Sequence, residues 1–233
     1  MSQYPRYAIY FVPGADSVLY RFGASLIGYD AYSGQSLAFP KDLETGVEGW
    51  ERFTSDPRKY GFHATLKAPI ALAAGKTESA LAAAMDAFAR TPRAIPVIKP
   101  AVRSISSFIA IIPDAPSEEL QAFARDCVMQ FDTFRAPLTA TDRERRNVSA
   151  LSERQVTYLD RWGYPYVLEE FRFHMTLAGS LPASRMETVT SFLRDRFAAL
   201  ELTSTPIDRL TLLRQDDATS RFRVIRQWPL KAA

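Results

Sequence analysis

Cysteine is nearly absent from this chain, since Cys127 is the only one among 233 residues. A single cysteine excludes an internal disulfide framework and is typical of a reducing compartment. Residues 1–6 lack the apolar core of a signal peptide. No apolar run approaches the roughly 20 residues that a membrane-spanning helix needs. We therefore expect a cytoplasmic protein with no membrane partner.

A strong charge of either sign is also lacking. The net charge is +3, with 47% apolar and 24% charged residues, which is ordinary for a globular domain. This mildly basic balance favours anionic partners but falls far short of a dedicated DNA-binding protein. Two basic runs, residues 143–146 and 221–226, could lie along an RNA path. Acidic neighbours dilute both runs, and such runs are usually solvated surface.

Histidine is almost as rare as cysteine, and its placement is the strongest signal in the sequence. The chain has two histidines, His63 and His174, and each lies in the string Phe-His-x-Thr-Leu. The two copies are 174 − 63 = 111 positions apart.

Each copy has the alternation of a half-buried strand. Residues i and i+2 of a strand point to the same side. One side of the first copy therefore carries His63, Thr65 and Lys67, and one side of the second carries Arg172, His174 and Thr176. The opposite sides carry only apolar residues, which we expect to face the core. Each strand thus presents an imidazole, a hydroxyl and a cation.

Similar elements are expected after each copy of the motif. The first copy predicts a strand at 62–68, a helix at 77–90 and strands at 95–105 and 108–112. The second predicts a strand at 170–178, a helix at 184–200 and strands at 207–214 and 221–228. This parallel order suggests an internal duplication and an α+β fold. We expect a single bilobal domain over residues 1–233, whose pseudo-symmetric lobes, 1–136 and 137–233, each have a mainly antiparallel sheet and flanking helices around a central cleft. This prediction includes the possibility that the two lobes exchange strands.

Other segments are predicted from local signals. Residues 7–12 read as a buried strand, followed by a helix that ends at Gly28. Residues 29–59 have a mixed period, so we expect a long loop with one helical turn near 43–53. Cys127 lies at helical spacing among apolar residues and is expected in the core rather than as a nucleophile.

Two histidines that face one cleft suit in-line attack on a phosphodiester. A neutral imidazole removes a proton from water or a hydroxyl, and a protonated one gives a proton to the departing oxygen. The ordinary histidine pKa of ~6.5 lets both forms coexist near neutral pH. Thr65 and Thr176 can donate to the phosphate oxygens, and Lys67 and Arg172 can offset their charge. This scheme requires no metal and no cofactor.

Three other interpretations compete with this one. A lone histidine on a strand is usually a satisfied core or surface residue, and threonine is common in strands. A zinc site would need further histidine or cysteine ligands, which the sequence does not offer. A non-catalytic module that binds a phosphorylated metabolite would have no need of two proton-transfer groups. The shared motif favours catalysis over each of these.

The paired motifs resemble the two-histidine (2H) phosphoesterase superfamily. That superfamily includes RNA 2′,3′-cyclic phosphodiesterases and 2′,5′-RNA ligases. One bacterial branch, often encoded with phosphonate-degradation genes, is similar over longer strings. These strings are Arg6-Tyr7-Ala8-Ile9-Tyr10-Phe11, Tyr60-Gly61-Phe62-His63-Ala64-Thr65-Leu66-Lys67-Ala68-Pro69, Trp162-Gly163-Tyr164-Pro165-Tyr166 and Phe171-Arg172-Phe173-His174-Met175-Thr176-Leu177.

The resemblance implies a bilobal fold with metal-independent catalysis in a central cleft. It implies general acid and base roles for His63 and His174, phosphate contacts for Thr65 and Thr176, and substrate contacts for Tyr60, Lys67 and Arg172. The branch implies a small phosphorylated substrate such as 5-phosphoribosyl 1,2-cyclic phosphate. RNA ends are the alternative substrate, and DNA is not expected.

Overall fold

The computed structural model describes residues 3–144 and 146–233. The predictions that involve Met1, Ser2 and Arg145 therefore lie outside the described residues. Its helices are α1 (Val18–Ile27), α2 (Lys41–Gly46), α3 (Trp50–Tyr60), α4 (Glu78–Arg90), α5 (Glu118–Phe131), α6 (Ala140–Glu144), α7 (Glu153–Trp162) and α8 (Ala183–Ala198). Its strands are β1 (Arg6–Phe11), β2 (Tyr29–Asp30), β3 (Gln35–Ser36), β4 (Ala64–Ala71), β5 (Val97–Ile98), β6 (Pro100–Ile105), β7 (Phe108–Pro113), β8 (Met175–Ala178), β9 (Thr205–Pro206), β10 (Arg209–Gln215) and β11 (Arg223–Pro229). Helices and antiparallel sheets of this kind confirm the predicted α+β class.

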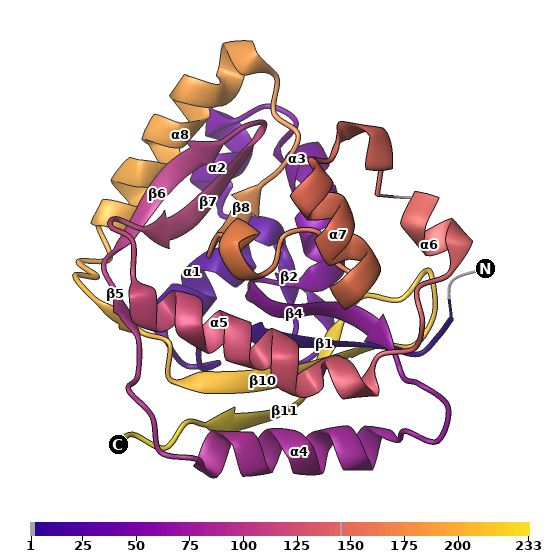
Figure 1. The fold of residues 1–233 in the computed structure, drawn as a ribbon. Coiled ribbons are helices and arrows are strands. Elements are labelled where there is room, and N and C mark those ends of the chain that lie inside the picture. The colour runs from indigo at the N-terminus through magenta and orange to yellow at the C-terminus, as the bar shows by residue number, and fades with distance from the viewer. Residues whose placement is uncertain (1–2, 145) are drawn as a thin grey trace.

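The larger sheet has the strand order β11-β10-β1-β4, with antiparallel pairing throughout. Its interior strand β1 is an unbroken apolar run, and residues 7–12 are each at most 4% exposed. Helix α4 contacts β10 and β11, and α5 contacts β4 (Figure 1). Such an apolar run is what a strand covered on both sides requires, as the sequence predicted.

The second sheet has the order β6-β7-β8 and is also antiparallel. Helix α8 packs on β6 and β7, whereas α1 and α3 contact β8 (Figure 1). The first motif thus enters β4 in one sheet, and the second enters β8 in the other.

Each of these sheets combines strands from both halves of the chain. The C-terminal hairpin β10–β11 joins β1 and β4, while the earlier hairpin β6–β7 joins β8. The order of motif strand, helix and hairpin recurs as predicted, as β4-α4-β6-β7 and β8-α8-β10-β11. The lobe boundaries at residues 136 and 137 stay a prediction.

Both motif strands are irregular at the same place. Between Thr65 and Lys67 the strand β4 advances two residues while its neighbour β1 advances one. Between Thr176 and Ala178 the strand β8 does the same against β7. The leucine of each motif is therefore the extra residue of a β-bulge, which redirects the side chains that follow it. The repeat thus extends to backbone geometry.

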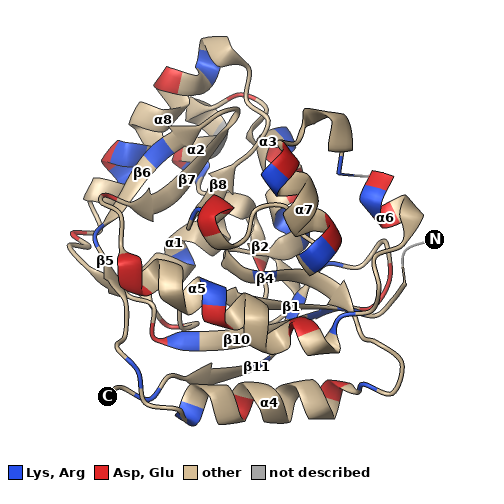
Figure 2. Cartoon of the chain, viewed as in Figure 1, with Lys and Arg blue, Asp and Glu red and all other residues tan. Residues whose placement is uncertain are grey.

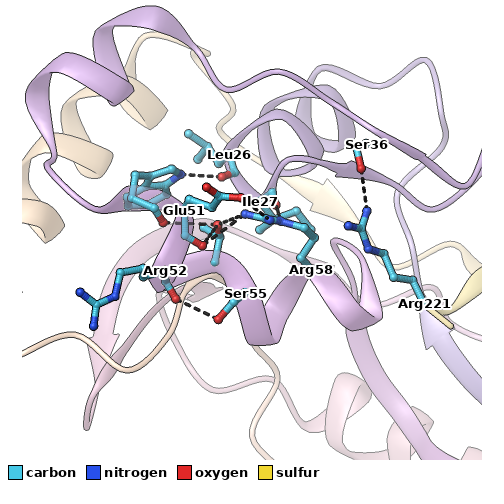
Figure 3. Close-up of polar contacts among 10 residues, drawn as sticks. Leu26, Ile27, Ser36, Glu51, Arg52, Ser55, Arg58 and Arg221 are labelled. Carbon is cyan, nitrogen blue, oxygen red and sulfur yellow. Dashed lines mark hydrogen bonds and ion pairs between the residues drawn. The ribbon is translucent and has the colours of Figure 1, made fainter. Parts of the chain in front are cut away.

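The predicted loop at residues 29–59 is wrong. The segment contains the hairpin β2–β3 and the helices α2 and α3. Figure 3 shows how α3 is fixed: Arg58 Nε donates to the carbonyl of Ile27 at 2.9 Å. Trp50 Nε1 likewise donates to the carbonyl of Leu26 at 2.7 Å. The side chains of α3 thereby satisfy carbonyls at the end of α1, a tertiary contact that local sequence does not reveal.

Smaller differences concern the ends of elements. The segment 137–147 contains α6, and α7 begins at Glu153 after a capping box on Ser152. The second motif strand is shorter than expected because a 3₁₀ turn, Leu168–Glu170, precedes it. Cys127 is buried in the core, as predicted, and burial raises the pKa of its thiol. No helix among the described residues is long and apolar enough to cross a membrane.

Candidate active site

The two motifs meet at one cavity of about 350 Å³. Its lining includes both histidines and both threonines of the motifs, together with Tyr60: His63, Thr65, His174, Thr176 and Tyr60. The sequence predicted this meeting from alternation and duplication alone. As expected, the apolar residues that flank each histidine are buried.

The imidazole of His63 is oriented by the backbone just before it. Its Nδ1 lies 2.8 Å from the carbonyl oxygen of Gly61. A carbonyl can only accept a hydrogen bond, so in the neutral ring Nδ1 carries the hydrogen and Nε2 is the basic nitrogen. Nε2 lies 3.3 Å from the hydroxyl oxygen of Thr65.

His174 is held in the same way by its own strand. Its Nδ1 lies 2.7 Å from the carbonyl oxygen of Arg172, again two residues earlier in the chain. The same argument leaves Nε2 of His174 as the basic nitrogen. Both copies therefore have the same tautomer, in which Nε2 is the basic nitrogen that can take part in proton transfer.

Gly61 has a backbone that suits only glycine. It follows α3, and its φ of 77° and ψ of 176° lie in a region closed to other residues. A Cβ at this position would lie 2.8 Å from the Cβ of Ala31. The carbonyl that orients His63 thus depends on a residue without a side chain.

Burial lowers the pKa of both imidazoles. The pKa of His63 falls to about 4, mainly through burial and further through the nearby His174. Burial also lowers the pKa of His174 below 6.5, against the opposing hydrogen bond to Arg172. Both histidines are therefore neutral at pH 7 in the free protein. A bound phosphate anion would favour protonation.

An aromatic ring from the neighbouring strand supports each imidazole. Tyr10 of β1 stacks on His63 with the ring centres 3.8 Å apart. Phe108 of β7 lies 5.4 Å from His174, with the rings tilted. These rings limit the orientations that the imidazoles can adopt.

The predicted position of Lys67 is wrong. Its side chain is 3% exposed and lies away from the cavity, with Nζ 2.6 Å from Asp132 Oδ1. The cause is the bulge after Thr65, which reverses the alternation before Lys67 is reached. Lys67 joins β4 to the end of α5 instead.

Tyr60 lines the histidine cavity, whereas Arg172 does not. Arg172 lines a neighbouring cavity of about 410 Å³ together with His174. Tyr60, the last residue of α3, stacks on Phe222 at 5.4 Å and lies 6.1 Å from the ring of His63. Their predicted contacts with a substrate stay predictions.

Other residues of the lining were not predicted from the sequence. These are chiefly Arg6, Tyr10, Arg146 and Tyr164. Arg6 and Tyr10 belong to β1, which the sequence identified only as a buried strand. A signal was present, because the first and third strings of the family resemblance contain Arg6, Tyr10 and Tyr164.

The chain is similar to two curated proteins over most of its length. It is 36% identical over 220 residues to "Ribose 1,5-bisphosphate phosphokinase PhnN" of Janthinobacterium sp. (strain Marseille), covering 91% of this chain and 48% of that protein. It is 30% identical over 234 residues to the protein of the same name from Laribacter hongkongensis (strain HLHK9), covering 97% of this chain and 52% of that protein. The chain thus spans about half the length of these relatives.

Solved structures with a similar layout include two of E. coli LigT and one described as a phosphoesterase. E. coli LigT complexed with NADP+ gives a TM-score of 0.46 at 13% identity, covering 99% of each chain. E. coli LigT complexed with 3′-AMP gives 0.42 at 13% identity, covering 98% of this chain and 99% of that one. A structure described as a phosphoesterase gives 0.45 at 12% identity with the same coverage. Scores below 0.5 mark a loose likeness, so the fold class follows from the strand order itself.

A family model covers most of the described site. It matches residues 65–223 and includes Thr65, His174 and Thr176. The chain belongs to this family, "Protein of unknown function (DUF1045)".

Proposed function

We propose that the chain is a phosphoesterase that hydrolyses a cyclic phosphodiester on a small ribose phosphate. One observation carries this proposal. Two imidazoles line one cavity, and each has its Nδ1 bound to a backbone carbonyl and its Nε2 left for proton transfer. A pure binding site has no need of two such groups. The resemblance of the motifs to the two-histidine phosphoesterases supports the same class.

The proposed reaction needs one neutral and one protonated imidazole. The neutral Nε2 accepts a proton from a water molecule as the water oxygen bonds to phosphorus. The bond from phosphorus to one ring oxygen breaks, and the protonated Nε2–H of the other imidazole gives its proton to that oxygen. The products are a phosphomonoester and a free hydroxyl group. The net proton count of the two histidines is unchanged, and the proposed steps use only groups of this chain.

The other polar groups of the cavity would stabilise the charge of the transition state. The hydroxyls of Thr65 and Thr176 would donate to the non-bridging oxygens of the phosphate. Lys67, to which the sequence assigned the neutralisation of the phosphate charge, does not line this cavity and is bound to Asp132. The two hydroxyls are in place before the reaction and cost little reorganisation.

The finer proposal for the substrate is 5-phosphoribosyl 1,2-cyclic phosphate, as part of phosphonate catabolism. The name of the two curated relatives refers to another phosphorylated ribose, ribose 1,5-bisphosphate. Their kinase activity does not suit this chain. Its Gly75-Lys76-Thr77 resembles the end of a nucleotide-binding P-loop, but the first glycine of that motif is replaced by Ile70 of β4.

Turnover of a panel of cyclic phosphates tests the proposal. The panel should hold 5-phosphoribosyl 1,2-cyclic phosphate, ribose 1,2-cyclic phosphate and nucleoside 2′,3′-cyclic monophosphates. Phosphorus NMR would identify which ester bond opens. We expect a phosphomonoester product with wild-type protein and little product with His174→Ala. Failure of wild-type protein to open any member would contradict the proposal.

A second candidate, hydrolysis of RNA 2′,3′-cyclic ends, is favoured by the cavity beside His174. This cavity of about 410 Å³ has aromatic lining residues, Phe108, Tyr164, Tyr166 and Phe171, on which a base could stack. Against it, Figure 2 shows both signs of charge interspersed over the outer helices, unlike the basic stripe of an extended RNA path. A higher kcat/KM for nucleoside cyclic phosphates, falling steeply with salt for longer RNA, would favour this candidate.

A further inference from the structure

A second polar cavity lies directly beside the histidine cavity. It has a volume of about 420 Å³. Arg6, Tyr60, Pro69 and Arg146 line both cavities, so the two cavities adjoin each other. A molecule that reacts at the histidines can therefore extend into this space.

Cations outnumber carboxylates in the second cavity. Among the described residues, its lining holds the four cations Arg6, Lys59, Arg135 and Arg146 and one carboxylate, Asp142. The charge of Arg135 is already offset by Asp132, at 2.8 Å. Three cations against one carboxylate remain, which favours an anionic group.

Arg6 is held in place without being neutralised. Its Nε and Nη2 donate to the side-chain oxygen of Gln215, which is itself fully buried. Gln215 in turn donates to the carbonyl of Ser220 at 2.7 Å. An amide oxygen orients the guanidinium but leaves its charge intact. The Nη1 hydrogens remain for another acceptor.

Arg146 is positioned in a comparable way. Its guanidinium lies 5.0 Å from the centre of the Tyr164 ring, and no carboxylate within the described part of the chain forms an ion pair with it. A ring orients a guanidinium while keeping its charge available. The two arginines shared by the cavities thus both lack an acidic partner among the described residues.

Many arginines elsewhere in the described part of the chain do have such a partner. The ion pairs include Arg58–Glu51, Arg90–Asp86, Arg103–Asp114, Arg143–Asp160, Arg209–Asp208 and Arg214–Glu78. Other described arginines also lack such an ion pair, so what distinguishes Arg6 and Arg146 is that each of them lines both cavities.

We propose that Arg6 and Arg146, with Lys59, form a subsite for a phosphomonoester carried by the substrate. The inference rests on the proposed function, because the histidine cavity must hold the cyclic phosphodiester of the same molecule. The substrate then has two anionic groups, one at the reacting centre and one at this subsite. Bidentate contacts from the guanidinium groups suit a dianionic phosphate. This subsite selects phosphorylated sugars over their unphosphorylated counterparts.

Steady-state kinetics on a matched pair of substrates tests the subsite. The pair is 5-phosphoribosyl 1,2-cyclic phosphate and ribose 1,2-cyclic phosphate, which differ only in the phosphomonoester. Arg6→Gln and Arg146→Gln should each raise KM for the phosphorylated substrate about tenfold or more, and much more than for the other. Arg143→Gln is the matched control, since Arg143 pairs with Asp160 outside both cavities and should leave both values unchanged. An equal rise for both substrates, or no rise, would overturn the proposal.

Binding of ribose 5-phosphate, measured by calorimetry, tests the subsite without any turnover. This probe has the phosphomonoester but no cyclic ester. Arg146→Gln, which removes a side chain with only a ring contact, should weaken binding about tenfold, whereas His174→Ala should not. The reverse result would place the phosphate at the histidines and overturn the subsite. Binding with this pattern in a protein that opens no cyclic phosphate would reject the proposed function and leave the subsite standing.

Discussion

Lys67 and Asp132 form a buried ion pair that joins the first motif strand to the end of α5. Lys67 Nζ lies 2.6 Å from Asp132 Oδ1, and Arg135 Nε lies 2.8 Å from the same oxygen. Burial lowers the pKa of Lys67, and the bond to Asp132 opposes that shift. Lys67, which the sequence predicted to contact the substrate, instead links the strand that follows His63 to the end of α5.

Lys67→Met should therefore affect stability rather than catalysis. Removing one partner of a buried pair costs about 3–5 kcal/mol, and we expect about 3 because Arg135 still pairs with Asp132. Denaturant unfolding measures this loss, and kcat/KM well below the unfolding transition should stay at the wild-type value. Lys99→Met is the control: Lys99 pairs with Asp114 at the surface, so its loss should cost less than about 1 kcal/mol. A Lys67→Met protein with normal stability but lost activity would show instead that Lys67 contacts the substrate.

Strand alternation was enough to predict the core of the site. Burial alternates through both motifs, and both histidines and both threonines line one cavity as expected. The prediction failed at Lys67, the residue after the first motif leucine, because a β-bulge depends on the neighbouring strand and not on the motif's own period. Lys67 was misplaced for that reason alone.

Residues brought in by tertiary packing could not be predicted from local patterns. Arg6 and Tyr10 lie on β1, where an apolar run indicates burial but not which strand lies beside it. Helix α3 was predicted as loop because its segment has a mixed period and contains Pro57, which lies in the last turn of the helix. Its stability comes from contacts such as that of Arg58 with the carbonyl of Ile27. Which hairpin joins which sheet is likewise decided by contacts between residues far apart in the sequence.

The dependence of kcat/KM on pH should have its maximum on the acidic side of neutrality. The reaction needs one protonated and one neutral imidazole, but both are neutral at pH 7 in the free protein. As the pH falls, His174 gains a proton below 6.5 and His63 follows near pH 4. We expect kcat/KM to peak between these values, and kcat, which reports the complex, to peak at higher pH because bound phosphate favours protonation. A kcat/KM maximum on the alkaline side would contradict the assignment.

Gly61→Ala should impair both stability and catalysis. The φ and ψ of Gly61 cost another residue about 1–3 kcal/mol, and the added Cβ would press on Ala31. Relief of that strain would move the carbonyl that orients His63, so kcat should fall with stability. Gly75→Ala is the control, because Gly75 also has a positive φ of 76° but has no atom within 4 Å of the added Cβ. It should lose some stability and keep its kcat; a Gly61→Ala protein with normal kcat would show that this carbonyl is dispensable.

The two histidines should act as one unit. His63→Ala and His174→Ala should each lower kcat by about 10²–10⁴-fold, since each removes one partner of a single proton-transfer step. The double variant should lose little more than the worse single variant, because removing either group already disables the step. Circular dichroism and the unfolding midpoint would confirm that the variants fold. Losses that multiply in the double variant would indicate independent roles. Unchanged turnover in either single variant would leave the pair as a binding site for a phosphorylated metabolite rather than a catalytic one.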